Sequence, residues 1–356
     1  MPELPEVETI KLGLEKKIVG LKISKIQILS PKSFQDANGK PFDPSTSLRT
    51  QGIRGRKVLK VWRRAKILGL DLSSHSGAER SEAKESRSYR SDKSDLQDDK
   101  GVTLLFHLKM SGQLIYDDGK RPALPRFARR ADASRGRFIG GHPTPDMVGK
   151  MPNAHTRVVF TFKGQESRVK SQGMQKSRLQ TLATSHLYFN DQRKFGWVRV
   201  VNSGQVTGES SLKNLGPEPL EKGFSWQILK SNLLNHKSMP IKVAIMDQAV
   251  VSGVGNIYAN EACFNAKLDP RTKVGQLTDK DMKSLHRGVL KALRDGIKHG
   301  GSSRAHFVDA DGHKGYFLDY AFVYGKDKHP CKKCDAEIKK IQLRGRGTYF
   351  CPSCQI

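Results

Sequence analysis

Acidic residues are scarce in this 356-residue sequence: Lys and Arg number 63, Asp and Glu only 35, and the formal net charge is +28. Long apolar runs are absent too. No stretch of ~18 apolar residues occurs and the first residues are charged, so we expect neither a membrane span nor a secretory signal. Neutralising phosphates releases counterions and gives strong, salt-sensitive affinity. The charge therefore favours a nucleic-acid partner over an anionic membrane or a purely solubilising surface.

Cysteine is also rare, and the odd count of five does not fit a secreted disulfide framework. Four cysteines form the pairs CKKC and CPSC, which are sixteen residues apart. This spacing predicts one closed, structural Zn²⁺ site with four thiolate ligands. A redox role would need a single C-x-x-C beside a strand–helix unit. The ligands would be Cys331, Cys334, Cys351 and Cys354, whereas Cys263 in a predicted helix is expected to be a buried small hydrophobe.

The pattern of apolar residues predicts an α+β multidomain protein. After Pro5, apolar residues recur at helical spacing. Strands are then predicted by short apolar or alternating runs, which are "KISKIQIL", "KILGLDL", "VTLLFHLKM", "RVVFTF", "HLYFND" and "GWVRVV". We therefore expect an N-terminal helix and a β-sandwich or barrel over residues 1–205. A helical domain is predicted over 206–323, and a small basic module with the four cysteines over 324–356.

Two stretches interrupt the strand pattern. Residues 73–100 are rich in serine and in charges of both signs, which predicts a disordered hairpin insertion. Residues 117–153 are rich in Arg, Pro and Gly, and we expect a second long, solvated loop there.

In the helical domain, "SWQILKSNLL" and "TDKDMKSLHRGVLKALRDGIKHGG" are amphipathic, and Thr278 and Asp281 are spaced as a capping box. Between them, "SGVGNIY" predicts a glycine turn before a helix capped by Asn256. Such a helix N-terminus attracts phosphate, although a Gly-rich turn is as often only a tight connection.

The start "MPELPEVET" contains a possible reactive centre. Removal of Met1 would expose the secondary amine of Pro2, and an α-amine titrates near ~8. An unprotonated nitrogen can attack an electrophilic sugar carbon to form an iminium, with Glu3 shuttling protons. In isolation, such a start is more often an ordinary beginning of a helix.

Three further motifs are ambiguous when each is read alone. "NDQRKFG" combines two cations with Phe195, which suits phosphate contact and insertion of a ring between bases, but the default is a core ring and surface charges. Lys66 in "RRAKILGL" would usually face solvent. Arg346, at the predicted hairpin tip between Gly345 and Gly347, would usually be a solvated charge.

Together these motifs resemble bacterial-type formamidopyrimidine-DNA glycosylases over nearly the whole chain. The matching segments occur in order: "MPELPEVET", "RRAK", "HLKMSG", "DQRKFG", "LGPEPL", "MDQAVVSGVGNIYANE", "GYF" and "GRGTYFCPSCQ". The resemblance implies an N-terminal helix with a β-sandwich, a helix–two-turn–helix domain and a zinc finger. It also implies a monomeric, cytoplasmic, nucleoid-associated repair enzyme that acts on damaged double-stranded DNA.

The resemblance further implies removal of 8-oxoguanine and formamidopyrimidines, followed by β,δ-elimination. Pro2 would attack C1′ of the damaged nucleotide and form a Schiff base. Glu3 would donate a proton at the sugar, with Glu6 in support. Lys66 would act in strand cleavage, and Arg346 would grip phosphate and assist the last elimination.

Residues expected to contact DNA follow from the same resemblance. His155, Arg193 and Lys237 match DNA-contacting positions, and Asn256 and Lys242 would hold phosphates near the extruded base. Extrusion is needed because the reactive carbon is unreachable within the base stack. The residues expected to fill the resulting gap are Met110, Arg193 and Phe195.

The sequence departs from the family pattern in both insertions, the second of which ends just before His155, and in Gln192, where proline is common. Three alternatives stay open. They are an endonuclease VIII-like enzyme acting on oxidised pyrimidines, a non-catalytic DNA-binding zinc protein, and an RNA-associated basic protein. The last fits poorly with an aromatic content of only 7%.

Overall fold

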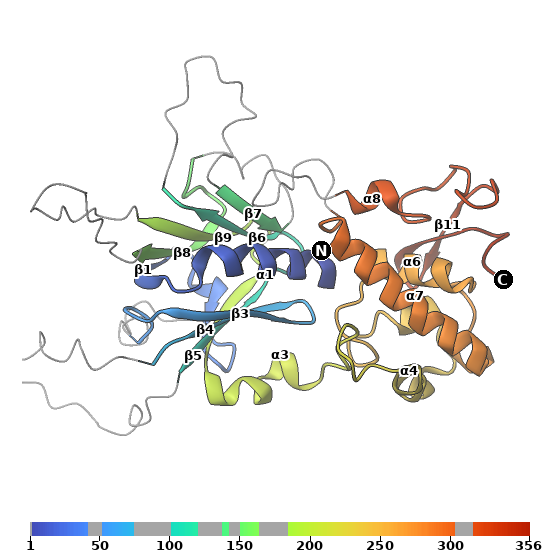
Figure 1. Cartoon of the computed structure of the whole chain (residues 1–356), viewed down its shortest axis with the longest axis horizontal. Coiled ribbons are helices and arrows are strands. Elements are labelled where there is room, and N and C mark those ends of the chain that lie inside the picture. Colours follow the sequence, from blue (N-terminus) through green and yellow to red (C-terminus); the bar gives the residue numbers. More distant parts are fainter. Residues whose placement is uncertain are drawn as a thin grey trace, which may run out of the picture.

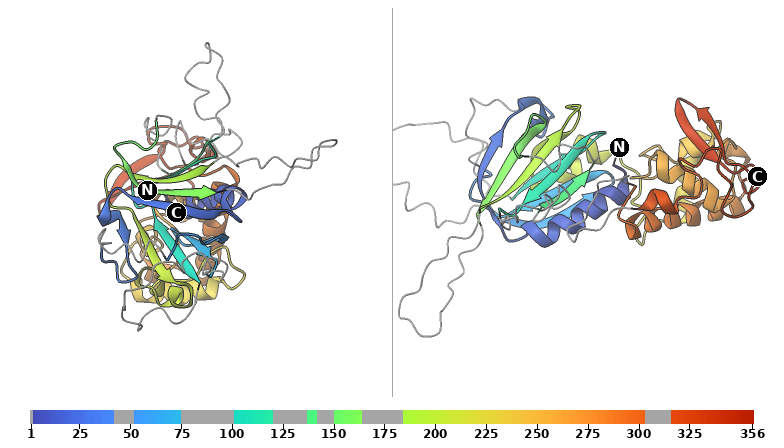
Figure 2. Two further views of the ribbon diagram at one scale, coloured as in Figure 1. Left: turned by 90° about the vertical axis from the view of Figure 1, so that its left-hand side faces the viewer. Right: turned by 90° about the horizontal axis from the view of Figure 1, so that it is seen from above.

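The computed structural model describes residues 2–41, 52–74, 101–119, 137–141, 150–163, 184–302 and 316–356. They form a β-rich lobe and a helical lobe, and the N-terminus lies at the junction between the two (Figures 1 and 2). No described helix is long and apolar enough to cross a membrane.

The β-rich lobe is a sandwich of two five-stranded sheets, with strand orders β1-β8-β9-β6-β7 and β2-β10-β5-β4-β3. Aliphatic and phenylalanine side chains of both inner faces form one buried core. The strands are β1 (Lys22–Ile28), β2 (Phe34–Gln35), β3 (Val58–Arg64), β4 (Ile67–Leu72), β5 (Val102–His107), β6 (Gly112–Asp117), β7 (Arg137–Gly141), β8 (Thr156–Lys163), β9 (Ser185–Asp191) and β10 (Trp197–Asn202).

Helix α1 (Leu4–Ile18) packs against β7 and β3, the edge strands of the two sheets, and so covers one open side of the sandwich. Its apolar stripe Val7, Ile10, Leu14 and Ile18 is fully buried, as the helical spacing predicted. The helix therefore runs from the sandwich core to the junction of the lobes.

All six sequence runs predicted as strands are strands in the structure, but β2, β3 and β6 were not predicted. The prediction of one long loop over 117–153 was wrong, because β7 lies within it and pairs with β6. Two features of the packing explain the miss. Phe138 is buried against α1 at Gly13, and a Cβ on Gly140 would lie 2.4 Å from Ile10, so contact with the helix fixes this glycine-containing strand. Residues 75–100, 120–136 and 142–149, which hold the remainder of both predicted insertions, lie outside the described residues.

The helical lobe has its own core, at the centre of which α6 and α7 pack along each other. Thr278 caps α7 as the sequence predicted, with its hydroxyl accepting from Asp281 N. The elements of this lobe are α4 (Trp226–Leu233), η6 (Leu234–His236), α5 (Ile241–Ala244), α6 (Asn256–Ala266), η7 (Val274–Gln276), α7 (Asp279–Lys298) and α8 (Phe317–Tyr320). The short elements η5 (Ser203–Gly208) and α3 (Ser210–Lys213), which precede them in the chain, pack on the β-rich lobe.

Buried side chains join the lobes and the C-terminal module. Leu4, the first residue of α1, is buried in the core of the helical lobe and donates its N–H to Gly253 O at 3.0 Å. Burial of a leucine side chain contributes roughly 2 kcal/mol. The hairpin of β11 (Lys339–Leu343) and β12 (Arg346–Phe350) belongs to a module whose small core includes Phe264 of α6. The N-terminal segment contacts the helical lobe just before α6, and the C-terminal module contacts α6 itself.

Candidate functional site

The centre of the site is the N-terminus of α6, where the carboxylate of Glu3 binds. Glu3 Oε1 accepts from Ile257 N at 3.0 Å and Oε2 from Tyr258 N at 3.4 Å. These N–H groups belong to the first turn of the helix, where they lack partners within the helix and where the dipole favours an anion. Gly255 makes the approach possible, since a Cβ there would lie 2.3 Å from Glu3 Cδ. Asn256, predicted as the cap, is the first helical residue, and Gly255 is the N-cap.

The environment of Glu3 favours its protonated form. Burial raises the pKa of Glu3 to about 6, and Glu6 adds to the rise. Lys66 and the two backbone hydrogen bonds oppose it. Glu6 is itself fixed, since its carboxylate accepts from Glu3 N at 2.8 Å, Tyr258 O–H at 2.7 Å and Ser302 N at 2.7 Å. Pro2, which immediately precedes Glu3, is also buried. Pro2 is thus next to a carboxyl group whose pKa lies above its ordinary value.

Lys66 lies in the turn between β3 and β4, not at a solvent-facing strand edge. Its side chain is buried and its ammonium donates to Val254 O at 2.9 Å, two residues before α6. Burial lowers the pKa of Lys66, and Arg346 lowers it further, whereas Glu3 and Glu6 raise it. The structure therefore brings Lys66, Glu3, Glu6 and Arg346 into one electrostatic group.

Sequence reasoning missed the residue that fixes this turn. Glu218, in "LGPEPL", is buried and forms ion pairs with Arg63 at 2.6 Å and Arg64 at 3.2 Å. It also accepts from the N–H of Ala65, whose φ is +52°. A carboxylate from the helical lobe thus stabilises a left-handed turn on the β-rich lobe. The signal was present, because "RRAK" and "LGPEPL" were both recognised, but neither motif indicates that it contacts the other.

The hairpin of the C-terminal module reaches the same helix terminus through Lys242. This buried lysine donates to Asn256 Oδ1 at 2.5 Å and to Thr348 Oγ1 at 3.2 Å. Asn256 Nδ2 in turn donates to Gly347 O at 3.2 Å. Burial lowers the pKa of Lys242 to about 8, and Arg346 contributes to the decrease. Three cations consequently surround the N-terminus of α6.

The turn of the hairpin differs from its prediction. Leu343 pairs with Arg346, so the turn residues are Arg344 and Gly345, whose φ values are both positive. Gly347 lies in β12, and Arg346 is the exposed first residue of that strand. The side chain of Arg346 is thus free to contact a ligand from a fixed position.

A second group of predicted residues meets on the sandwich. Met110 and Phe195 are 45% and 56% exposed, which is unusual for large apolar side chains. Arg193 joins them, since its guanidinium is 3.3 Å from Met110 Sδ and lies 5.2 Å from the centre of the Phe195 ring. Phe195 is therefore not a core residue. The three side chains form an exposed cluster, here called the wedge, on two loops that precede β6 and follow β9.

The remaining predicted contacts lie elsewhere. His155 is half-buried in the turn before β8, and its carbonyl accepts from Asp191 N at 2.9 Å, which places the turn beside the wedge loops. Lys237 is exposed after η6 on the helical lobe, and its carbonyl accepts from Gly275 N. The described contacts do not join Lys237 to the α6 terminus.

A cavity of about 430 Å³ lies beside Lys66 and is lined in part by His107, Lys109 and Arg199. Burial lowers the pKa of His107 to about 3, and the neighbouring cations Lys109, Lys66 and Arg199 lower it further. Its Nδ1 accepts from Lys109 N at 3.0 Å, so the neutral ring carries its proton on Nε2. Sequence reasoning gave His107 no role, although it lies in the recognised motif "HLKMSG".

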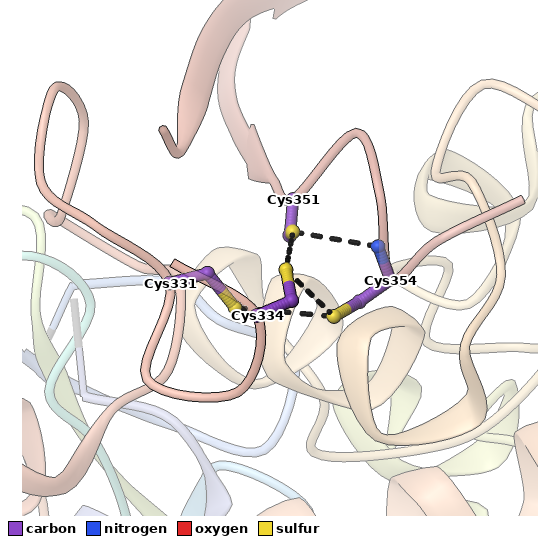
Figure 3. Close-up of side chains that lie close together, drawn as sticks. All are labelled: Cys331, Cys334, Cys351 and Cys354. Atoms are coloured by element: carbon purple, nitrogen blue, oxygen red, sulfur yellow. Dashed lines mark hydrogen bonds between the residues drawn. The ribbon is translucent and has the colours of Figure 1, made fainter. Parts of the chain in front are cut away.

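The four predicted zinc ligands converge (Figure 3). All four Sγ atoms lie within 4.8 Å of one another, and Cys263 is buried in α6 away from them. A tetrahedral tetrathiolate site with Zn–S bonds of about 2.3 Å places its sulfurs about 3.8 Å apart. The donor set fits one zinc ion, as the sequence predicted.

Family models match most of the chain. The formamidopyrimidine-DNA glycosylase N-terminal domain matches residues 1–198, the H2TH domain of the same enzymes 215–307, and the zinc finger found in FPG and IleRS 328–356. The chain belongs to the formamidopyrimidine-DNA glycosylase family. It is a DNA glycosylase of base excision repair, and its four cysteines form the zinc site of the family's finger.

Individual relatives agree with this glycosylase along its whole length. The formamidopyrimidine-DNA glycosylase of Pelotomaculum thermopropionicum is 31% identical over 355 residues, which cover 100% of this chain and 99% of the relative. A Lactococcus lactis FPG mutant in complex with Fapy-dG-containing DNA is 26% identical with a TM-score of 0.69. A complex of Lactococcus lactis Fpg with abasic-site DNA is 27% identical with a TM-score of 0.68. Each structure covers 99% of both chains.

Proposed function

We propose that this glycosylase is bifunctional and that it removes oxidised purines, 8-oxoguanine and formamidopyrimidines, from double-stranded DNA and then cleaves the strand. The observation that carries the proposal is the buried Glu3 carboxyl, which adjoins Pro2 and has a pKa of about 6. A carboxyl group held in this way is suited to donate a proton near neutral pH. The similar structures with Fapy-dG and with carbocyclic 8-oxo-G DNA support the choice of an oxidised purine, and the structure with abasic-site DNA supports action on the abasic product.

In the first step, the unprotonated nitrogen of Pro2 attacks C1′ of the extruded nucleotide. The bond between C1′ and the base breaks, and the base leaves with the proton that the Pro2 nitrogen gives up on forming its bond to C1′. Glu3 protonates the sugar oxygen, so that the ring opens and an iminium links protein and deoxyribose. Glu6 keeps Glu3 in place through the hydrogen bond from Glu3 N. Initiation requires that Met1 has been removed.

In the second step, loss of a proton from C2′ expels the 3′ phosphate, and a further elimination expels the 5′ phosphate. Lys66 is the group proposed for this proton transfer, since burial lowers its pKa and so increases its fraction of free amine. Arg346 binds the phosphate as it leaves. Lys242 and Asn256 hold the hairpin against the α6 terminus, which keeps Arg346 within reach.

Binding precedes both steps. The exposed wedge of Met110, Arg193 and Phe195 fills the gap left by the extruded nucleotide, and His155 and Lys237 contact the backbone of the duplex. The zinc finger gives the hairpin its shape through Cys331, Cys334, Cys351 and Cys354; when bound, the zinc ion supplies a structural crosslink only.

Paired excision assays test this proposal. Wild-type protein should release 8-oxoguanine from a duplex and leave thymine glycol largely untouched, and Glu3→Gln should lose base release by about a hundredfold or more. Because a preformed abasic site needs no base release, the same variant should still nick an abasic duplex. Preference for thymine glycol would indicate the endonuclease VIII-like alternative, and no release from either duplex would indicate a DNA-binding protein without this activity.

A further inference from the structure

Two loops that are distant in sequence meet at one buried carboxylate, that of Asp191 at the end of β9. Asp191 is fully buried and lies opposite Gly112, the first residue of β6, in the antiparallel register. The loop before Gly112 carries Met110, and the loop after Asp191 carries Arg193 and Phe195. Asp191 thus lies where both wedge loops join the sheet.

The carboxylate binds donors from both loops. Its Oδ1 accepts from Ser111 Oγ at 2.5 Å and from Arg193 N at 3.2 Å, and its Oδ2 accepts from Gly196 N at 2.6 Å. Ser111 Oγ also accepts from Arg193 N at 3.1 Å, which closes the network. One side chain therefore sets the distance between the two loops.

The backbone of Asp191 is held from the opposite side. Its N–H donates to His155 O at 2.9 Å, and its carbonyl accepts from Arg157 Nε at 2.8 Å. Gly196 packs so closely that a Cβ would lie 2.9 Å from the Phe189 ring and 3.1 Å from Asp191 Oδ2. The carboxylate cannot shift without moving these groups.

The positions of the wedge residues depend on the hydrogen bonds of Asp191, because packing does little to hold their own side chains. Met110 and Phe195 are about half exposed. Lys194, which lies between Arg193 and Phe195, has a left-handed φ of +60°. A wedge must be rigid to hold a base step open, since unstacking costs a few kcal/mol per step. The rigidity of the wedge has to come from the hydrogen bonds where the two loops join the sheet.

We propose that Asp191 is a positioning residue for nucleotide extrusion, which acts by holding the two wedge loops at a fixed separation. The inference rests on the proposed function, in which the wedge fills the gap left by the extruded nucleotide. Because Asp191 is fully buried, this role acts through the loops and not through direct contact with DNA.

The test uses the full-length zinc-loaded protein and a duplex with a tetrahydrofuran abasic analogue beside 2-aminopurine, whose fluorescence rises on unstacking. In Asp191→Asn one acceptor oxygen becomes a donor facing Gly196 N. The rate of the fluorescence rise should fall by on the order of tenfold to a hundredfold. Ser111→Ala removes one donor and keeps the carboxylate, so its effect should be smaller. Asp117→Asn is the matched control, because Asp117 is buried at the opposite end of β6, and it should stay within about threefold of wild type.

A second readout separates extrusion from chemistry. Release of 8-oxoguanine by Asp191→Asn should be slow from a paired duplex and should recover to within about threefold of wild type when the lesion lies in an unpaired bubble, where extrusion costs least. An equal loss on both substrates with a normal fluorescence rise would overturn the proposal, and so would wild-type behaviour of both Asp191→Asn and Ser111→Ala. The fluorescence probe cannot be excised, so it decides the role of Asp191 even if wild-type protein releases no base.

Discussion

Glu3 lies where α1, α6 and the turn of Lys66 converge, and its properties come from that position. The helix N-terminus and Lys66 stabilise its negative charge, but burial outweighs them and the pKa rises to about 6. The sequence allowed Glu3 to be named through a family resemblance. Its pKa could not be predicted, because burial depends on residues that are some 250 positions away in the chain.

This pKa predicts a pH-dependent stability. The folded protein holds the Glu3 proton more tightly than the unfolded chain does, whose glutamate has a pKa near 4.5. The resulting stabilisation is present at low pH and is lost as the pH rises from about 4.5 to about 6. It amounts to about 2 kcal/mol. Urea unfolding at pH 4.5 and pH 7.5 measures the free energy of unfolding of wild-type protein and Glu3→Gln. As the pH rises between these values, the wild type should lose about 2 kcal/mol more of this free energy than the variant. Parallel curves would contradict the shift.

Gly255→Ala is predicted to impair chemistry while leaving binding intact. Gly255 has φ −133°, which alanine also adopts, so the effect comes only from the Cβ 2.3 Å from Glu3 Cδ. Displacing a catalytic group by about 1 Å can cost about a hundredfold in rate. Single-turnover excision should fall by that order, with unchanged affinity for a tetrahydrofuran duplex. Gly223→Ala, in open space, is the matched control. Equal rates for both variants would show that Glu3 does not need its present position.

Among the elements, α6 organises the site, because its N-terminus contacts two distant segments. Its backbone binds the Glu3 carboxylate, and the side chain of Asn256 binds the C-terminal hairpin. The sequence predicted this helix, its glycine turn and the zinc knuckles, since each has a local pattern. It did not predict β7 or the contact of Glu218 with the β3–β4 turn. Both depend on packing between distant segments, which leaves no periodic signal in the sequence.

Loss of zinc should uncouple the hairpin from α6. Cys351→Ser is expected to bind no zinc and to weaken affinity for damaged duplex by on the order of tenfold, since the hairpin with Arg346 loses its fixed shape. Cys263→Ala, which removes the buried thiol of α6 and keeps all four ligands, should retain one zinc per chain. Metal analysis and fluorescence anisotropy measure the two quantities. Full affinity of the metal-free variant would contradict the proposed role of the finger.

At the scale of the whole molecule, the two lobes meet at the N-terminus, so the proposed nucleophile Pro2 belongs to a segment at their junction (Figure 2). Leu4 in the helical core and Glu218 on the β3–β4 turn hold the lobes together. The net charge of +28 gives the protein as a whole a strong attraction for phosphate. Charge and family resemblance predicted the partner, whereas the joining of the lobes is visible only in the structure.

The same charge predicts a steep salt dependence of binding. For six to ten phosphate contacts, affinity for a lesion duplex should fall by on the order of a thousandfold or more between 50 and 200 mM salt. Arg346→Ala should lower the slope of log Kd against log salt by about 1, because one phosphate contact is lost. A flat salt response would contradict binding through the phosphate backbone.

The most direct measurement locates the covalent bond between protein and DNA. Wild-type protein is incubated with an 8-oxoguanine duplex and borohydride, digested with protease, and analysed by mass spectrometry. The modified nitrogen should be that of Pro2 in a peptide without Met1, and Pro2→Gly should yield far less adduct. An adduct on Lys66, or full excision by protein that retains Met1, would contradict attack by the terminal proline.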